Sequence, residues 1–170
     1  MPRPRYHLLA TLPIAAVAAR TWGGPAALGA LCGGMLIDAD HVVDYVWTRA
    51  RGRKSHYLAP LHAWELLLAL GFFARAAVRS ERRRRVPDHW VGSQAGGPVH
   101  AGAAVLAGVA VGMMGHLAVD VAGNRPRHAG VYSLVFRLRH GFTRESTGWT
   151  EEGGFHGWSE LPWYQWWRAF

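Results

Sequence analysis

Residues 99–123 read VHAGAAVLAGVAVGMMGHLAVDVAG, an apolar run in which His116 and Asp120 lie close to the carboxyl end. A helix needs roughly 20 mostly apolar residues to cross a bilayer, and this run is long enough. Its frequent glycines and alanines are typical of helices whose backbones approach each other closely inside a membrane. The run therefore predicts a membrane helix that carries a histidine and an aspartate near one end.

Three other apolar stretches precede this run, at residues 7–19, about 22–47 and 58–78. The stretch at 58–78 can span a bilayer, and 22–47 can do so if its polar end emerges, whereas 7–19 predicts a tilted or partly inserted helix. Residues 1–18 can also be interpreted as a secretory signal peptide, because a basic start, an apolar core and a small-residue end follow in that order. The membrane-like segments that come next favour a retained helix.

The composition is typical of a small helical membrane protein. Half of the 170 residues are hydrophobic and 18% are charged, with a formal net charge of +8. The basic run RSERRRRV, residues 79–86, has no accompanying stacking platform or groove-reading motif, so we expect a membrane-flanking loop and no nucleic-acid partner. Cys32 is the single cysteine, so no disulfide can form within the chain, and it lies in an apolar run.

These features predict an all-α fold: an integral-membrane bundle of about four helices in residues 1–123 and a C-terminal interfacial tail in residues 124–170. In the tail, VYSLVFRLRH at residues 131–140 has apolar residues at helical spacing and predicts an amphipathic helix at the membrane surface. The tryptophan-rich end is typical of an interfacial aromatic belt, with a lid or a carbohydrate platform as the alternative. The expected partner is the lipid bilayer, and the expected location is multi-pass in the inner (cytoplasmic) membrane.

Successive membrane helices run in alternate directions, so their polar ends can be traced to one side of the bilayer. The start of the first helix, the end of the second, the start of the third and the end of the fourth all fall on that side. Acidic and imidazole residues from 38–44, 62–65 and 116–120 therefore lie on the same face as His7. The distribution of basic residues favours the cytoplasm for this face, while the arginine run at 82–85 argues against that orientation.

The stretch GGMLIDADHVVDY, residues 33–45, places three aspartates and a histidine directly after small and apolar residues. Ionised carboxylates are costly there unless something positive holds them together. At about 100° per residue, Asp40, His41 and Asp44 fall within one arc of a helix, whereas Asp38 points elsewhere unless the helix unwinds. Helix C-termini also disfavour negative charge, so a purely structural role has no evident benefit.

Two further pairs have the spacing of ligands on one helix face. His116 and Asp120 are four residues apart, and His62 and Glu65 are three apart. Each pair taken alone is explained equally well by an intrahelical hydrogen bond. Imidazole together with carboxylate suits Zn²⁺, Mn²⁺ or Fe²⁺ and argues against a thiolate site. The predicted ligands outnumber those of one tetrahedral ion, so we expect two ions, zinc first; the ligands are His7, Asp38, Asp40, His41, Asp44, His62, Glu65, His116 and Asp120.

The motifs GGMLIDADHVVDY, SHYLAPLHAWELLL and GHLAVDVAGN together resemble the inner-membrane-bound, metal-dependent hydrolase family, and NRPRHAGVYSLVFRLRHGF extends the likeness over about residues 7–142. More distantly, the His-x-x-x-Asp element at residues 116–120 is similar to the helical elements that bind metal in zinc-dependent phospholipase C. The resemblance implies metal-ligand roles for Asp38, Asp40, His41, Asp44, His62, Glu65, His116 and Asp120.

We therefore expect a membrane-bound hydrolase that cleaves a phosphoester or related bond in a lipid-like or phosphorylated small substrate through a metal-activated water. A spare carboxylate, Glu65 or Asp44, is the expected general base. Arg53, Lys54 and Arg137 could hold an anionic substrate, although interfacial basic residues usually face lipid.

Two other classes of protein fit the same residues. The main alternative is a non-catalytic membrane protein that binds or transports a divalent metal, since intramembrane Asp and His also mark ion pathways. The polar residues stop at one end of the predicted bundle, which favours a site over a pore. A structural or partner-binding membrane protein is the third interpretation.

Overall fold

The computed structural model describes residues 4–50, 59–84, 100–124 and 129–143, and within them every regular element is helical. The predicted all-α fold is thus confirmed. The elements, in chain order, are α1 (Pro4–Trp22), α2 (Gly24–Met35), the 3₁₀ turn η1 (Leu36–Ala39), α3 (Asp40–Ala50), α4 (Trp64–Arg84), α5 (Ala101–Asn124), the 3₁₀ turn η2 (Ala129–Tyr132) and α6 (Leu134–Arg139).

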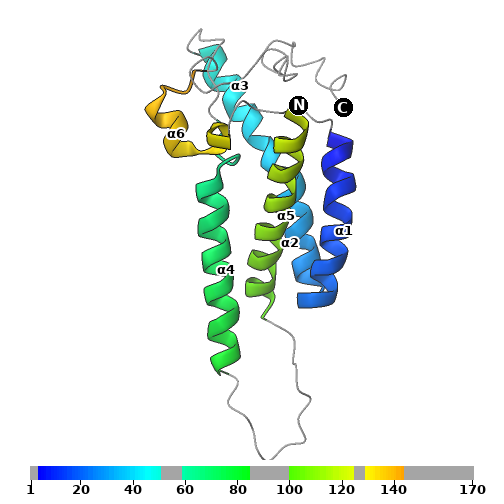
Figure 1. Ribbon diagram of the computed structural model, residues 1–170. Coiled ribbons are helices and arrows are strands. Elements are labelled where there is room, and N and C mark those ends of the chain that lie inside the picture. Colours follow the sequence, from blue (N-terminus) through cyan, green and yellow to red (C-terminus); the bar gives the residue numbers. More distant parts are fainter. Residues whose placement is uncertain (1–3, 51–58, 85–99, 125–128, 144–170) are drawn as a thin grey trace, which may run out of the picture.

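The long helices stand side by side and alternate in direction, as Figure 1 shows. Helices α1, α2 and α5 pack against one another, whereas α4 packs chiefly against α5. One end of the bundle, the upper end in Figure 1, contains the start of α1, the η1 turn, the start of α4, the end of α5 and α6. We call this the upper end, and the opposite end, where α1 and α4 finish, the lower end.

Small residues set the close approach of α2 and α5. A Cβ atom added to Gly33 would lie 2.3 Å from the carbonyl oxygen of Val109, and one added to Gly112 would lie 2.1 Å from that of Ala30. Gly29 and Gly108 face the opposite backbone equally closely, with added Cβ atoms at 2.3 and 2.0 Å. The glycine-rich sequences therefore bring the two backbones into direct contact, as small-residue motifs do in membrane helices.

The predicted helix at residues 22–47 is interrupted twice. Gly23 has φ +92°, a conformation suited to glycine, and it turns the chain from α1 into α2. Between Met35 and Asp40 the helix tightens into the η1 turn before α3 begins. Because a 3₁₀ turn has about three residues per turn instead of 3.6, η1 changes the direction in which Asp38 points.

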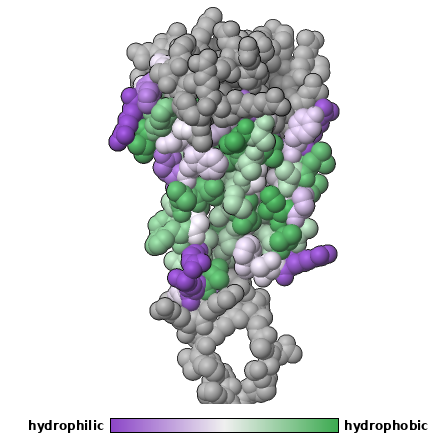
Figure 2. Space-filling model, in the orientation of Figure 1, coloured by the Kyte–Doolittle hydropathy of each residue, from purple (hydrophilic) through white to green (hydrophobic). Residues whose placement is uncertain are grey.

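The sides of the bundle expose large apolar side chains. Leu9 of α1 is 65% exposed, Leu28 of α2 is 61% exposed and Phe72 of α4 is 69% exposed. Figure 2 shows apolar surface around the middle of the bundle, with hydrophilic residues toward its two ends. Two helical stretches, Gly24–Val43 and Ala101–Asn124, are long and apolar enough to cross a membrane. Among the described helices, α1 and α4 are not candidate spans.

The beginning of the predicted tail packs onto the bundle. Helix α6 covers six residues, and Leu138 is exposed while Arg137 is fully buried. The helix is shorter than residues 131–140 suggest because η2 takes the first turn, and its amphipathic role at a membrane surface stays a prediction. The tryptophan-rich end lies outside the described residues, and the division into domains at residue 123 stays a prediction.

Candidate metal centre

Six of the predicted ligands meet at the upper end of the bundle. Their nitrogen and oxygen atoms form three overlapping groups in which all ligand atoms lie within 4.8 Å of one another. Each group combines imidazole with carboxylate. The groups are His7, Asp38 and His116; Asp38, His41 and His62; and His62, His116 and Asp120.

Separate elements supply these side chains. The first turns of α1 contribute His7, η1 and the start of α3 contribute Asp38 and His41, and the loop before α4 contributes His62. The last two turns of α5 contribute His116 and Asp120, four residues apart on a buried face. The alternation of helix direction is therefore what brings residues 7 to 120 together. The η1 turn is the local unwinding that Asp38 needed in order to join them.

The hydrogen bonds of two histidines determine which ring nitrogen keeps a lone pair that could bind a cation. Nδ1 of His116 lies 2.9 Å from the carbonyl oxygen of Gly34, which can only accept, so this nitrogen carries the proton. Nδ1 of His62 lies 3.1 Å from both carboxylate oxygens of Asp40 and donates to them. In the neutral rings both Nε2 atoms are left with lone pairs, and these two atoms are 3.1 Å apart. These facing lone pairs are satisfied either by a proton on one of the two rings or by a metal ion near both nitrogens.

Asp40 is placed as the outer partner of this arrangement. Its carboxylate accepts the Nδ1 proton of His62 and hydrogen bonds from the backbone nitrogens of Leu61 and His62, at 2.8 and 3.3 Å. A carboxylate or a backbone carbonyl behind the imidazole is the usual support of a metal-bound histidine. Asp40 therefore orients a ligand and does not itself belong to any of the three groups.

The spacing of one group matches that of ligands on one ion. Nε2 of His62 is 3.2 Å from Oδ2 of Asp120, Nε2 of His116 is 3.5 Å from the same oxygen, and the two nitrogens are 3.1 Å apart. A tetrahedral zinc ion with bonds of about 2.0–2.1 Å holds its ligand atoms about 3.3 Å apart. These three atoms thus have the separations expected for one triangular face of a zinc site.

Two carboxylates connect the groups. Oδ1 of Asp38 lies 3.4 Å from Nε2 of His62, 3.4 Å from Nε2 of His116 and 3.5 Å from Nε2 of His41. The second oxygen of Asp120, Oδ1, lies 3.5 Å from Nε2 of His7, whose ring stacks on His116 with centroids 3.9 Å apart. Each carboxylate therefore lies close to imidazoles from more than one of the three groups.

Most of the cluster is closed to solvent. His62 and His116 are 0% exposed and Asp120 is 1% exposed, whereas the side chain of Asp38 is 24% exposed. Among the described residues, Nδ1 of His7 and Oδ2 of Asp120 are buried without a hydrogen-bond partner. Buried polar atoms are costly unless something satisfies them. The donor set, its spacing and these unsatisfied atoms fit a divalent metal ion, with access from the side of Asp38.

Glu65, which the sequence predicts as a ligand or general base, lies outside these three groups. Its carboxylate accepts hydrogen bonds from Oγ of Ser133 at 2.5 Å and from the backbone nitrogens of Leu134 and Val135 at 2.9 and 3.2 Å. The physical reason is that α4 begins at Trp64, so His62 precedes the helix and the two residues do not share a helix face. Glu65 instead stabilises the first turn of α6.

Arg137 has a supporting role that the sequence does not reveal. Its guanidinium is fully buried and donates to the carbonyl oxygens of Ala59 and His62, at 2.8 and 3.0 Å. It therefore holds the loop that carries His62 and does not face lipid. In the sequence it is indistinguishable from the neighbouring, exposed Arg139.

Asn124 and Tyr132 extend the buried polar region beyond the predicted set. Asn124, one turn after Asp120, donates from Nδ2 to the hydroxyl of Tyr132 at 2.9 Å. Burial raises the pKa of the Tyr132 phenol, so the hydroxyl stays protonated. In the sequence, His116, Asp120 and Asn124 follow one another at four-residue spacing, and this spacing could have indicated that Asn124 lies on the same face of α5. The side chain of Asp44 lies outside the described residues, so its predicted ligand or base role stays a prediction.

No family model, curated protein or solved structure matches the chain. The interpretation of the cluster therefore depends on its own geometry.

Proposed function

We propose that this protein is a membrane-embedded, metal-dependent hydrolase that acts on a phosphoester or related bond of a lipid-like substrate. The observation that supports it most directly is the pair of Nε2 atoms of His62 and His116, 3.1 Å apart, whose Nδ1 protons point away to Asp40 and Gly34. A divalent ion between these nitrogens and the Asp120 carboxylate satisfies all three groups. This proposal also agrees with the resemblance to the inner-membrane-bound, metal-dependent hydrolases.

A divalent ion supplies Lewis-acid chemistry and acidifies water, which suits hydrolysis of a phosphoester. The chain's own residues would hold the ion from buried positions and exclude bulk water from the cluster. Asp38 is the cluster carboxylate with appreciable exposure, so it faces the direction from which a substrate arrives. Zinc is our first expectation, because histidine and carboxylate at these spacings suit it, and manganese or iron is the next.

Two ions fit the cluster better than one. A four-coordinate ion uses at most four of the six residues in the three groups. Asp38 and Asp120 each present oxygen atoms toward more than one imidazole, as carboxylates between two ions do. We therefore expect about two ions per chain.

Placement in a membrane is part of the proposal. Two helical stretches are long and apolar enough to cross a membrane, and α1 and α4 add exposed leucine and phenylalanine to the sides of the bundle. A bilayer would cover this apolar surface and bring lipid-like substrates to the upper end. The predicted location is the inner membrane, with the metal cluster near the cytoplasmic face.

The alternative, a protein that moves a divalent metal across the membrane, predicts polar side chains along the whole length of the bundle. Among the described residues, the buried polar and charged side chains gather at the upper end. Thr11, one turn below His7, is the deepest of them on α1, and its hydroxyl is satisfied by the carbonyl oxygen of His7. This distribution favours a localised site.

Metal analysis of the purified protein tests the proposal. The detergent-solubilised chain should contain about two zinc, manganese or iron ions, and His116→Ala and Asp120→Asn should lose them, whereas His100→Ala, an exposed histidine at the lower end, should keep them. The loaded protein is then assayed on phospholipid and on bis(p-nitrophenyl) phosphate. Metal without any hydrolysis would favour the binding or transport alternative, and no metal after reconstitution with each ion would refute the site.

A further inference from the structure

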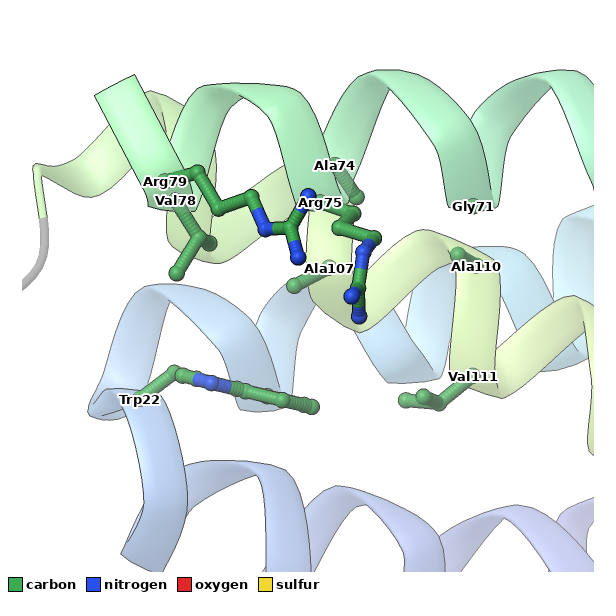
Figure 3. Close-up of a pocket in the computed structure, with 9 residues that line it drawn as sticks. All are labelled: Trp22, Gly71, Ala74, Arg75, Val78, Arg79, Ala107, Ala110 and Val111. Atoms are coloured by element: carbon green, nitrogen blue, oxygen red, sulfur yellow. The ribbon is translucent and has the colours of Figure 1, made fainter. Parts of the chain in front are cut away.

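A second polar feature lies at the lower end of the bundle, in a groove between α4 and the helices α1 and α5. The groove has a volume of about 540 Å³, which is within the usual range of ligand pockets. Figure 3 shows Trp22 on one side, Arg75 and Arg79 of α4 on the other, and Ala107 and Val111 of α5 along the wall between them.

This groove is distinct from the metal cluster. His7 is in the first turns of α1, whereas Trp22 is the last residue of that helix. Fifteen residues at about 1.5 Å each separate the two along the helix axis by about 22 Å. The groove therefore belongs to the opposite end of the bundle.

The two arginines form an unneutralised cationic pair. They are four residues apart, and their guanidinium groups extend into the same groove (Figure 3). Within the described part of the chain, the ion pairs all involve histidine, so neither guanidinium is matched by a carboxylate. Like charges at this helical spacing repel each other, and an anion between them removes the repulsion. Arginine binds phosphate, like carboxylate, through paired N–H donors.

The rest of the groove is apolar and aromatic. Ala74, Ala107, Ala110 and Val111 offer methyl groups, and Trp22 offers a ring. A free inorganic anion would leave these surfaces unused, whereas an alkyl chain would cover them. A second hollow of about 470 Å³ shares both arginines and includes the exposed Phe72, so the guanidinium groups are also open to the apolar outer side of α4.

We propose that this groove binds an anionic phospholipid from the surrounding bilayer. Its phosphate lies on Arg75 and Arg79, one acyl chain runs along the α5 wall, and Trp22 packs at the interface level, where tryptophan is common. The site requires that the bundle lies in a bilayer but does not require the metal cluster. Its failure and that of the hydrolase proposal are therefore separate results.

Native mass spectrometry of the detergent-solubilised chain tests this, with phosphatidylglycerol, phosphatidylcholine and inorganic phosphate as probes. We expect phosphatidylglycerol to bind at least tenfold more tightly than phosphatidylcholine, and Arg75→Gln/Arg79→Gln to lose at least tenfold in that affinity. Arg20→Gln is the matched control, because Arg20 is an exposed arginine at the same end that does not line the groove. It should bind phosphatidylglycerol as the wild type does.

A second variant tests the groove without changing charge. Gly71 lines the groove and an added Cβ there meets nothing within 4 Å, so Gly71→Leu adds bulk to the groove lining without a clash at its first side-chain atom. It should weaken phosphatidylglycerol binding at least fivefold, while Gly102→Leu, another open glycine, should not. Equal loss in Arg20→Gln and the double variant would mean general surface attraction and overturn the proposal. So would unchanged binding in Gly71→Leu, or displacement of the lipid by equimolar inorganic phosphate.

Discussion

Gly112→Ala tests whether direct backbone contact between α2 and α5 holds the bundle together. The added Cβ would lie 2.1 Å from the carbonyl oxygen of Ala30, whereas ordinary contacts begin at 3.4 Å. The neighbour is a backbone atom, so the helices must shift locally by 0.9 Å to reach the 3.0 Å at which real Cβ contacts begin, and by 1.3 Å to reach ordinary contact. Overpacking of this kind costs about 1–3 kcal/mol of unfolding free energy.

Helix propensity acts in the opposite direction. Replacing a glycine by alanine inside a helix contributes about 1 kcal/mol of stability, so the net effect of Gly112→Ala is a loss of up to about 2 kcal/mol. Gly102→Ala is the matched control on the same helix, because its added Cβ meets nothing within 4 Å. For a chain of this size, each kcal/mol shifts the melting temperature by about 2–4 °C. The two variants should therefore shift the melting temperature in opposite directions.

Thermal unfolding in a mild detergent, followed by circular dichroism, measures both shifts. We expect Gly102→Ala, in the first turn of α5, to melt slightly above the wild type and Gly112→Ala, in the helix interior, to melt several degrees below it. Gly112 is also one turn before His116, so its variant should bind metal more weakly. A Gly112→Ala protein that melts with or above Gly102→Ala would refute the close packing of α2 on α5.

Three further substitutions separate the supporting residues from the ligands. Asp40→Asn should lower metal affinity about 10–100-fold, because an amide cannot accept from the His62 ring and from both backbone nitrogens at once. Isothermal titration measures this affinity. An unchanged affinity would mean that Asp40 does not support His62. Arg137→Met should cost about 1–3 kcal/mol of unfolding free energy and weaken metal binding, since the carbonyls of Ala59 and His62 lose their donor; an unaltered melting temperature would contradict this. Glu65→Gln should leave the metal content unchanged while destabilising α6 by about 0.5–2 kcal/mol, whereas lost metal would restore Glu65 as a ligand.

The arrangement at the upper end could be predicted from the sequence because it follows from the number and order of the apolar segments. Successive long apolar segments alternate in direction, and one end of the bundle consequently holds His7, the residues after 37, His62 and the end of α5. His116 and Asp120 could be paired from their spacing, since α5 is continuous between them. These predictions use only the periodicity of a helix and the order of the segments.

The remaining features depend on where helices begin and end, which periodicity does not determine. Asp38 joins the cluster because the chain forms a 3₁₀ turn there, and Glu65 leaves it because α4 starts two residues after His62. The division of Asp40 and Asp38 into supporting and ligand-forming carboxylates depends on the path of the loop at residues 59–62. The burial of Arg137 depends on that same loop, whose carbonyls are its partners.

The dependence of α4 on α5 has a consequence for biogenesis. Helix α4 packs chiefly against α5, which is synthesised after it, so α4 has no stable neighbour while the ribosome is still translating the chain. The same late helix delivers His116 and Asp120 to the cluster. An ion held by these residues would therefore bind only after the last long helix is in place.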